Sequence, residues 1–340
     1  MSDSVPSISV IVPAYNAADT IGECLEALRH QNVPRDTHEV IVVDDGSTDE
    51  TAQIVARHGA IVLRQTNRGA AAARNLGLAA ARGSVLLFTD SDCAPAADWI
   101  QEMIAPLSDV QLAGTKGVYR TRQKSLTARF VQIEYEERYD HTARHTYLDL
   151  VDTYAACYRR DALLASGGFD PRFRYLEDQE LSFRMAEAGY KMAFCPRAAV
   201  YHRHPESWRA YAQKKARIGY WKTFVLRLHP GKAQRDSHTP ASVKLQMLLA
   251  ALSAPLAVLA LRWELCAWLL AATLGAFLVS AMPFLAKAWH RDRVVTLICL
   301  PALYVRAWSL GLGLAAGYAD RLLGRGPLAA ASRSGSGQSL

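Results

Sequence analysis

Short apolar runs alternate with helical patterns between residues 7 and 89. The runs at 7–12 (SISVIV), 39–43 (EVIVV) and 84–89 (SVLLFT) are largely apolar or β-branched and end at turn residues, which predicts buried strands. Between them, residues 21–28 and 70–81 carry apolar or small side chains at helical spacing. Repeated βα units of this kind predict an α/β domain with a Rossmann-like, mostly parallel sheet and helices on both faces.

The pattern changes after Lys244, where three long apolar segments follow at residues 245–261, 265–286 and 294–318. As helices, the first two would span about 26 Å and about 33 Å, close to the ~30 Å hydrocarbon core of a bilayer. A short polar turn at 262–264 separates them. Basic residues flank both outer ends of this hairpin, which predicts that these ends face the cytoplasm.

The third apolar segment has two interpretations. It is long enough to cross a bilayer, but Pro301 and Arg306 lie near its middle. An arginine at the centre of a span costs at least ~2.5–3.5 kcal/mol, which a re-entrant or interfacial placement would avoid. The sequence therefore predicts two firm spans and leaves the third open.

Residues 208–228 (WRAYAQKKARIGYWKTFVLRL) mix aromatic and basic side chains just before the apolar region. The chain has a net charge of +7, and much of the excess lies between Arg203 and Lys244. Such a run could contact nucleic acid, but its position beside apolar segments favours anionic lipid headgroups. We therefore expect a membrane partner, no nucleic acid, and a helix in the membrane interface; a solvated helix is the alternative.

These patterns divide the chain into four expected regions. They are an α/β domain at 1–205, an interfacial helix region at 206–243, a membrane region of two to three helices at 244–319, and a flexible tail at 320–340. The N-terminus has no basic stretch before its first apolar run, so no cleaved signal peptide is expected. The six cysteines lack paired spacing, which argues against a zinc site or a disulfide framework. The expected location is the inner (cytoplasmic) membrane, with multiple spans and the α/β domain facing the cytoplasm.

Two carboxylates, Asp90 and Asp92, follow the strand predicted at 84–89. The carboxyl ends of parallel strands form the crevice where open α/β sheets bind ligands. Two acidic side chains repel each other there unless a cation joins them, and hard oxygen ligands suit Mg²⁺ or Mn²⁺ carrying a phosphorylated substrate. The alternative is that Asp92 caps a helix entered through Pro95.

Five motifs occur in a fixed order: SVIVPAYN, VVDDGSTDET, NRGAAAARNLG, FTDSD and GGFD…YLEDQELSFRMAEAGY. In order and spacing, they resemble the family 2 glycosyltransferases with the GT-A fold, over residues 7–205. The resemblance implies a GT-A domain that binds a nucleotide-sugar donor with Mg²⁺ or Mn²⁺, followed here by C-terminal transmembrane helices.

The resemblance also implies a donor-binding set. Tyr15, which follows Pro13 at the exit of the first strand, would stack on a uracil-type base, and Asp45 would accept its ring N–H. Asn67 and Arg74 lie at a strand-to-helix passage, where Arg74 would bind the diphosphate or ribose. The alternatives are an Asx turn at residues 44–46 with a core tyrosine, and an Arg74 that pairs with a structural carboxylate.

For the metal, the resemblance implies that Asp92 is the direct ligand and that Asp90 binds ribose or metal-bound water. His202 stands where many GT-A enzymes place a late histidine near the metal, with His204 as a neighbouring alternative. A lone histidine more often fills an interface than binds a cation.

For catalysis, the resemblance makes Asp178 the general base that deprotonates the acceptor hydroxyl, and Glu177 a residue that orients the acceptor or a loop. The alternative is that the start of a helix simply favours carboxylates. Residues 167–170 (GGFD) look like a flexible loop that helps shape the donor sugar pocket.

Together these features predict an inverting enzyme that moves one sugar from a nucleoside-diphosphate sugar, preferentially UDP-linked, to a hydroxyl of a lipid-linked or membrane glycan acceptor. The alternatives are a processive polysaccharide synthase subunit and a non-catalytic scaffold for envelope glycan assembly. Processive relatives carry a Gln-x-x-Arg-Trp signature, whereas here residues 213–218 read QKKARI. The sequence does not predict an oligomeric state.

Overall fold

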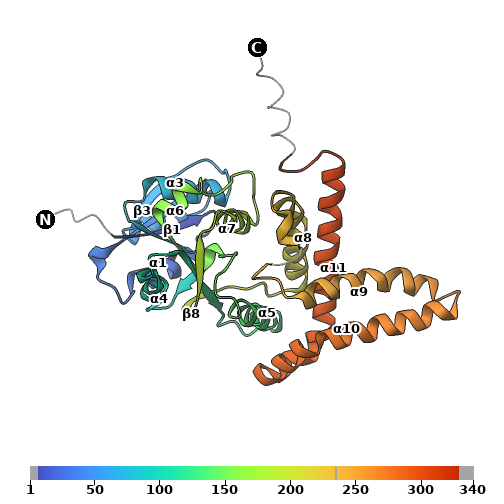
Figure 1. Ribbon diagram of the computed structural model, residues 1–340. Helices are drawn as coiled ribbons and strands as arrows, with labels where there is room; N and C mark the ends of the chain where they lie inside the picture. The colour runs from blue at the N-terminus through green and yellow to red at the C-terminus, as the bar shows by residue number, and fades with distance from the viewer. Residues whose placement is uncertain (1–6, 234–235, 329–340) are drawn as a thin grey trace, which may run out of the picture. The chain divides into compact units, whose positions relative to one another are not determined.

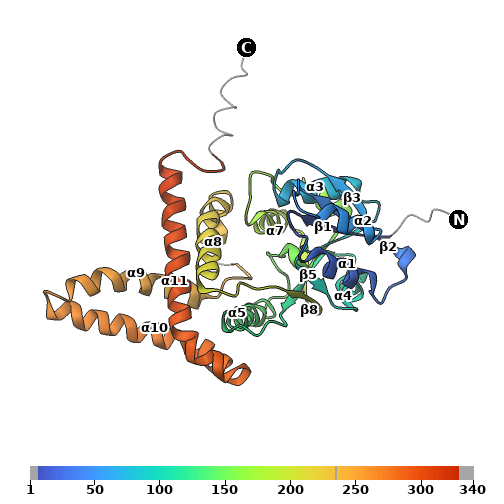
Figure 2. The same ribbon diagram turned by 180° about the vertical axis from the view of Figure 1, so that it is seen from behind.

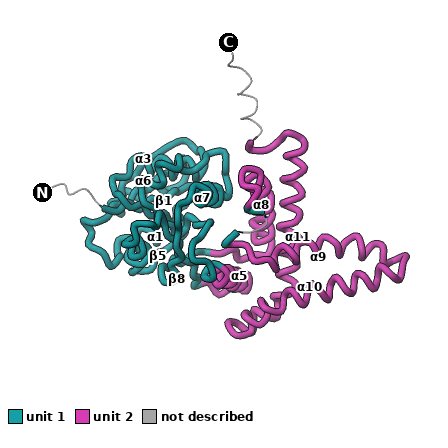
Figure 3. The backbone as a smooth tube through the Cα atoms, viewed as in Figure 1, with its two compact units in different colours: residues 1–122, 142–203, 232–237 teal, residues 123–141, 204–231, 238–340 magenta. Residues whose placement is uncertain are grey.

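The computed structural model describes residues 7–233 and 236–328, which form two compact units (Figure 1). Unit 1 comprises residues up to 122, 142–203 and 232–237, and unit 2 comprises residues 123–141, 204–231 and 238 onward (Figure 3). Each unit draws on separate stretches of the chain. This division by contacts does not test the four regions expected at 1–205, 206–243, 244–319 and 320–340, which stay a prediction.

Unit 1 contains one eight-stranded sheet in the order β3-β2-β1-β4-β7-β6-β8-β5. Parallel pairs join β3, β2, β1 and β4, and also β6 and β8, whereas β7 and β5 pair antiparallel to their neighbours. The α/β class and the mostly parallel sheet predicted from the repeated βα pattern are confirmed. The strands are β1 (Ile8–Ala14), β2 (His38–Asp44), β3 (Ile61–Arg64), β4 (Val85–Phe88), β5 (Cys93–Pro95), β6 (Leu112–Arg120), β7 (Ala156–Arg159) and β8 (Lys191–His202).

Helices cover both faces of this sheet, as Figure 1 shows for α3 and α6 on one side and α1 and α4 on the other. On the α3 side, alternate strand residues such as Ile11 and Phe88 form one buried cluster with the helices. In α3, Gly77 permits a close approach of the helix to strand β1, because a Cβ at this position would lie 2.5 Å from the Ile11 side chain. The helices are α1 (Ile21–Arg29), α2 (Thr51–Arg57), α3 (Ala70–Ala80), α4 (Trp99–Ile104), α6 (Arg160–Ala165) and α7 (Glu177–Glu187), with 3-10 turns at Arg35–Thr37, Ala105–Ser108 and Thr153–Ala155.

Unit 2 is helical. Its members are α5 (Leu126–Thr142), α8 (Trp208–Leu228), α9 (Ala241–Leu259), α10 (Glu264–Arg291) and α11 (Arg293–Leu322); the 3-10 turn Pro230–Ala233 follows α8. Helices α9 and α10 form a hairpin that extends away from α8 and α11 (Figures 1 and 2). Helices α9, α10 and α11 are all long and apolar enough to cross a membrane. The predicted C-terminal apolar helices are thus confirmed by length and composition.

A buried ionic cluster holds α5, α8 and α11 together. The carboxylate of Glu134 lies 3.0 Å from the Lys215 ammonium and 3.1 Å from the Arg306 guanidinium, and it accepts a hydrogen bond of 2.9 Å from the Tyr211 hydroxyl. Burial alone would raise the pKa of Glu134, but Lys215 and Arg306 outweigh it and hold this pKa at about 2. Arg306 also donates to the side chain of Gln246 in α9. The arginine in the third apolar segment therefore has a carboxylate partner.

Glycines allow α8 and α11 to pack backbone against backbone. A Cβ on Gly313 would lie 2.0 Å from the Ala216 carbonyl oxygen, and a Cβ on Gly219 would lie 2.2 Å from that of Leu310. A Cβ on Gly311 in the same helix would meet nothing within 4 Å.

This difference gives a matched pair of variants. We expect Gly313→Ala to destabilise the detergent-solubilised protein by ~1–3 kcal/mol, because the helices must separate to admit the methyl group. We expect Gly311→Ala to be neutral or to stabilise by up to ~1 kcal/mol, because alanine is the better helix former. Thermal unfolding followed by circular dichroism measures both, and equal shifts would contradict the close packing.

Candidate active site

Sequence-predicted donor residues gather at one edge of the sheet. Pro13 and Tyr15 lie at the carboxyl end of β1, Asp45 follows β2, Asn67 follows β3 and Asp90 follows β4. These four strands are parallel neighbours, so their carboxyl ends meet at the same edge. This is the edge at which α/β sheets bind ligands.

The loop between β3 and α3 is held mainly by Asp45. Its carboxylate accepts hydrogen bonds from the Gln65 side chain at 2.7 Å and from the backbone N–H groups of Arg68 and Gly69, both at 2.8 Å. Its neighbour Asp44 accepts a hydrogen bond from the Ser47 N–H, three residues on, so its side chain holds the turn after β2. The ring of Tyr15 is 50% exposed and is therefore open to a flat ligand, rather than being a core residue.

Arg74 joins two sequence-predicted motifs. Its guanidinium is 4% exposed and forms ion pairs with Asp90 at 2.7 Å and with Glu177 at 2.5 Å. Pairing with carboxylates was the alternative to diphosphate binding, and the structure shows that pairing. The acidic motif that follows β4 and the acidic pair that opens α7 therefore converge on one side chain.

The residues that could hold a metal lie beside this link. Ligand atoms of Asp90, Asp92 and Cys93 all lie within 4.8 Å of one another. The imidazole Nε2 of His202 lies 3.4 Å from the Asp92 carboxylate, because β5 and β8 pair with Cys93 opposite His202. The alternative His204 belongs to unit 2, where its ring stacks on Tyr135.

This donor set fits a divalent cation. Burial raises the pKa of Asp90, and the neighbouring Asp92 raises it further, although Arg74 opposes them. A cation between the two carboxylates would relieve this cost. Carboxylate oxygens suit Mg²⁺ and Mn²⁺, and an imidazole suits the latter better.

A sharp turn at Leu176 precedes the helix that carries the candidate base, Asp178. Leu176 has φ +62°, a left-handed conformation that costs a residue other than glycine ~1–2 kcal/mol, and α7 begins immediately after it. Asp178 accepts a hydrogen bond from the Gln179 N–H at 2.8 Å. Burial, together with the charges of Glu177 and Asp152, raises the pKa of Asp178 to about 8, against the opposing effect of Arg74.

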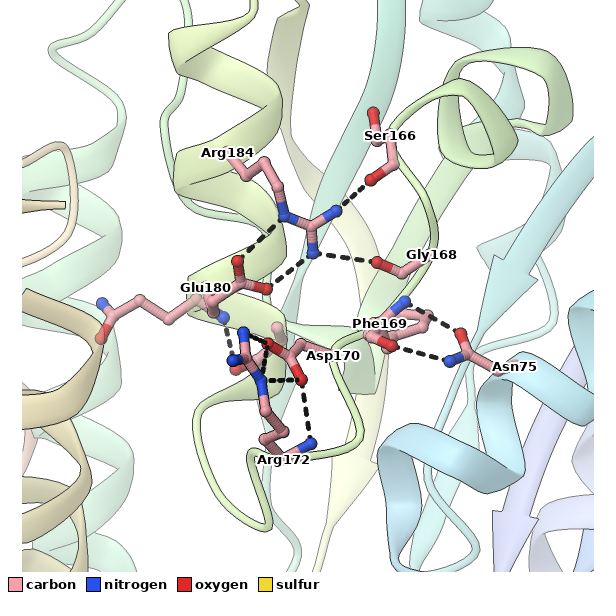
Figure 4. Close-up of polar contacts among 10 residues, drawn as sticks. Asn75, Ser166, Gly168, Phe169, Asp170, Arg172, Glu180 and Arg184 are labelled. Atoms are coloured by element: carbon pink, nitrogen blue, oxygen red, sulfur yellow. Dashed lines mark hydrogen bonds and ion pairs between the residues drawn. The ribbon is translucent and has the colours of Figure 1, made fainter. Parts of the chain in front are cut away.

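Figure 4 shows how the loop at 166–172 is held between α3 and α7. Asn75 exchanges two hydrogen bonds with the backbone of Phe169, at 2.7 Å and 2.9 Å. Arg184 donates to the carbonyl oxygens of Ser166 and Gly168 while it pairs with Glu180. The loop was expected to be flexible, but these contacts restrain it.

Sequence reasoning missed several residues near the site. Cys93 belongs to the possible ligand group, and Lys116 forms a buried ion pair of 2.6 Å with Asp152. The rings of Tyr119 and Tyr154 stack at 3.4 Å. The pairs come from separate segments and had no local signal; only Cys93, next to Asp92, could have been noticed.

Comparison with known proteins supports the fold and the family. Residues 9–164 match the model described as Glycosyl transferase family 2. The chain is 29% identical to glycosyltransferase AglE of Haloferax volcanii, over 57% of this chain and 66% of that protein. It is 30% identical to the pre-mycofactocin glycosyltransferase of Mycobacterium tuberculosis, over 66% of this chain and 48% of that protein. The chain spans about half to two-thirds of the length of these curated relatives.

Among solved structures, the chain resembles the mannosyltransferase PcManGT from Pyrobaculum calidifontis, solved in complex with GDP-Man and Mn²⁺. The TM-score is 0.59 at 24% identity, over 94% of this chain and 88% of that one. This likeness shows a GT-A fold followed by helices. Residues 9–164 therefore form a family 2 glycosyltransferase domain, as the first four motifs had indicated.

Proposed function

We propose that this protein is an inverting glycosyltransferase that moves a single sugar from a nucleoside-diphosphate sugar to a hydroxyl of a lipid-linked or membrane glycan acceptor. One observation carries the proposal: Arg74 binds both Asp90 of the metal-type motif and Glu177 of the base-type pair. Donor activation and acceptor deprotonation can then occur in one cleft, as single displacement requires.

Asp92, Asp90 and His202 would hold the divalent cation, which neutralises charge that develops on the departing diphosphate. Tyr15 would stack on the base, and Asp45 would accept its N–H. Pro13 and Asn67 would border the donor at the same sheet edge. Asp178 takes the proton from the acceptor hydroxyl, and Glu177, held by Arg74, keeps α7 in position.

The identity of the donor is part of the proposal. PcManGT was solved with GDP-Man and Mn²⁺, which supports a divalent cation and does not favour uridine over guanosine. The sequence motifs favour a UDP-sugar. A panel of UDP- and GDP-sugars, each titrated with Mn²⁺, would separate these donors by thermal shift, since a bound ligand stabilises the folded state.

The apolar helices support a membrane location and an acceptor at the membrane. Exposed apolar side chains on α9 and α10 include Leu252, Val258, Trp268 and Val279. A bilayer is the environment that satisfies such surfaces. We propose that the enzyme is a multi-pass protein of the cytoplasmic membrane, with its GT-A domain in the cytoplasm, acting on acceptors displayed at the bilayer.

Two alternatives are tested by the same assay. A processive synthase would release products of many lengths, whereas single transfer gives one added sugar. A non-catalytic scaffold would neither transfer nor slowly hydrolyse a nucleotide sugar in the presence of Mn²⁺. Turnover that stops on chelation, and a product one sugar longer, would support the proposal.

The metal role of Asp92 is tested by binding. We expect Asp92→Asn to weaken Mn²⁺-dependent donor binding by at least ~10-fold, because outer partners alone account for 10–100-fold effects at metal sites. Isothermal calorimetry with and without Mn²⁺ measures the change. Asp109→Asn, in an exposed turn, is the control. Unchanged Mn²⁺-dependent affinity in Asp92→Asn would remove Asp92 from the ligand set.

A further inference from the structure

Helix α11 differs from α9 and α10 in what it packs against, although all three are long and apolar enough to cross a bilayer. The most apolar part of α11 is 39% buried inside the protein, against 17% for α9 and 11% for α10. Its partners are the polar helices α5 and α8 as well as parts of the hairpin helices α9 and α10. The placement of α11 therefore depends on where these partners can lie.

Helix α8 follows α11 over much of its length. Contacts link Ala216 to Gly313 and Thr223 to Gly317, and the Tyr220 hydroxyl donates to the Asp320 carboxylate. From Ala216 against Gly313 to Thr223 against Gly317, the residue numbers rise in both helices, so the two helices run parallel; Figure 2 shows them side by side. If α11 crossed a bilayer, α8 would have to cross with it.

Helix α8 is unsuited to the hydrocarbon core. Its 21 residues include six basic side chains distributed from one end to the other: Arg209, Lys214, Lys215, Arg217, Lys222 and Arg227. Only Lys215 of these is fully buried, where it pairs with Glu134. A charged side chain at the centre of a bilayer costs at least ~2.5–3.5 kcal/mol. Moving α8 into the core would therefore cost far more than the burial of α11 returns.

The first half of α11 is tied to a second charged helix. Asp292, which caps α11, forms an ion pair of 2.5 Å with Arg129 of α5, and Arg306 pairs with Glu134 of α5. The last turns of α10 pair with the same helix, through Lys287 to Asp140 at 2.6 Å. The base of the α9–α10 hairpin therefore lies at the level of α5.

We propose that α11 does not cross the membrane but lies in its interface beside α5 and α8, so that only the α9–α10 hairpin spans the bilayer. The partner of its outer face is the headgroup and upper acyl region of one leaflet. That face carries exposed apolar residues along the whole helix: Leu297, Leu300, Val305, Leu312, Tyr318 and Leu322. An in-plane helix with this pattern binds a bilayer by burying its apolar face while basic neighbours meet anionic lipids.

Spin labels along the exposed face provide a direct test. Leu297→Cys, Val305→Cys and Leu312→Cys are made singly in full-length Cys266→Ala protein, because the other cysteines are buried. The labelled proteins are placed in vesicles of neutral and anionic phospholipids. Leu297 and Leu312 lie about 22 Å apart along α11. We expect all three labels to report nearly equal depth by oxygen and nickel-chelate accessibility. A monotonic depth change close to that separation would overturn the proposal, and so would three labels exposed to water.

Topology gives an independent readout. Epitope tags at the N-terminus, in the turn after Arg262 and at the C-terminus are tested in separate full-length proteins by protease accessibility in sealed vesicles. An in-plane α11 places the two terminal tags on one side and the turn tag on the other. A C-terminal tag on the same side as the turn tag would show that α11 crosses. This outcome would leave the proposed transferase activity untouched.

Discussion

Asp178→Asn is expected to reduce kcat for sugar transfer by ~10²–10⁴-fold, because the amide cannot accept the acceptor proton. Mn²⁺-dependent donor binding should persist, because Asp178 is not one of the two carboxylates, Asp90 and Asp92, that would hold the cation. Single-turnover transfer and calorimetry together separate these two effects. Asp161→Asn is a matched control, because Asp161 also accepts an N–H from the next residue in the first turn of a helix, at 2.7 Å, and is exposed.

Near-normal turnover by Asp178→Asn would exclude Asp178 as the base. Loss of donor binding together with turnover would instead indicate that the variant distorts the cleft. Asp161→Asn should leave both quantities unchanged. If it reduces kcat as strongly, the effect belongs to the start of any helix and not to Asp178.

The pH dependence follows from the raised pKa of Asp178. Since only the ionised carboxylate accepts a proton, kcat/KM should rise with pH and level off above about 8. In the donor complex, the bound cation should lower the pKa of Asp178, so the rise of kcat with pH should occur at lower pH than the rise of kcat/KM. A limb of kcat/KM that is unchanged in a variant retaining residual activity, such as Asp178→Glu, would assign the titration to another group.

Stability should show the opposite trend. Because the pKa of Asp178 is higher in the folded than in the unfolded protein, protonation favours folding. This contribution is complete below the unfolded value of ~3.9 and is lost as pH rises through about 8. In Asp178→Asn the side chain cannot ionise, so the folded protein is not destabilised at high pH. This variant should therefore unfold at a higher temperature than the parent at about pH 9.

Arg74→Met has the second large expected effect, which is on stability. Removing one partner of a buried ion pair costs about 3–5 kcal/mol, because the remaining charge is left uncompensated. For a unit of this size the thermal midpoint should fall by roughly 6–20 °C. Arg197→Met, which breaks an exposed pair with Glu102, should change little. Differential scanning calorimetry compares the two variants.

Two further variants test whether the loss of stability comes from the broken link between the two motifs. The double variant Arg74→Met/Glu177→Gln removes one of the two carboxylates left unpaired by Arg74→Met. Its thermal midpoint should therefore lie above that of Arg74→Met alone. Arg74→Lys keeps the charge but not the two-pronged geometry, so it should retain only part of the stability. A thermal midpoint of Arg74→Met within the range of Arg197→Met would contradict the link between the motifs.

The strands and the motifs could be predicted from sequence because their signals are local. Runs such as 39–43 specify buried strands, and Asp90 and Asp92 come within four residues of the end of another, β4. The partners of Arg74 could not be predicted, since Glu177 lies 103 residues away and nothing near Arg74 indicates it. The same reason hid the pair of Lys116 with Asp152. Tertiary proximity, which local patterns do not encode, decided both.

The assignment of α5 to unit 2 was also beyond the local pattern. Its sequence, LTARFVQIEYEERYDHT, lies between two parts of unit 1 and reads as an ordinary helix. Its burial depends on α8, α10 and α11, which follow much later in the chain. The helix α5, which lies within the region expected at 1–205, thus packs against helices that follow later in the chain.

The chain passes repeatedly between the two units, and this limits how the enzyme can be shortened. A soluble fragment that stops at residue 205 would leave Glu134 without Lys215 and Arg306, and would expose Phe130 to water. It would also lose the Lys232 ammonium that lies 2.8 Å from Asp149. Truncation should therefore yield an insoluble or poorly folded fragment, so purification needs the whole polypeptide in detergent or nanodiscs.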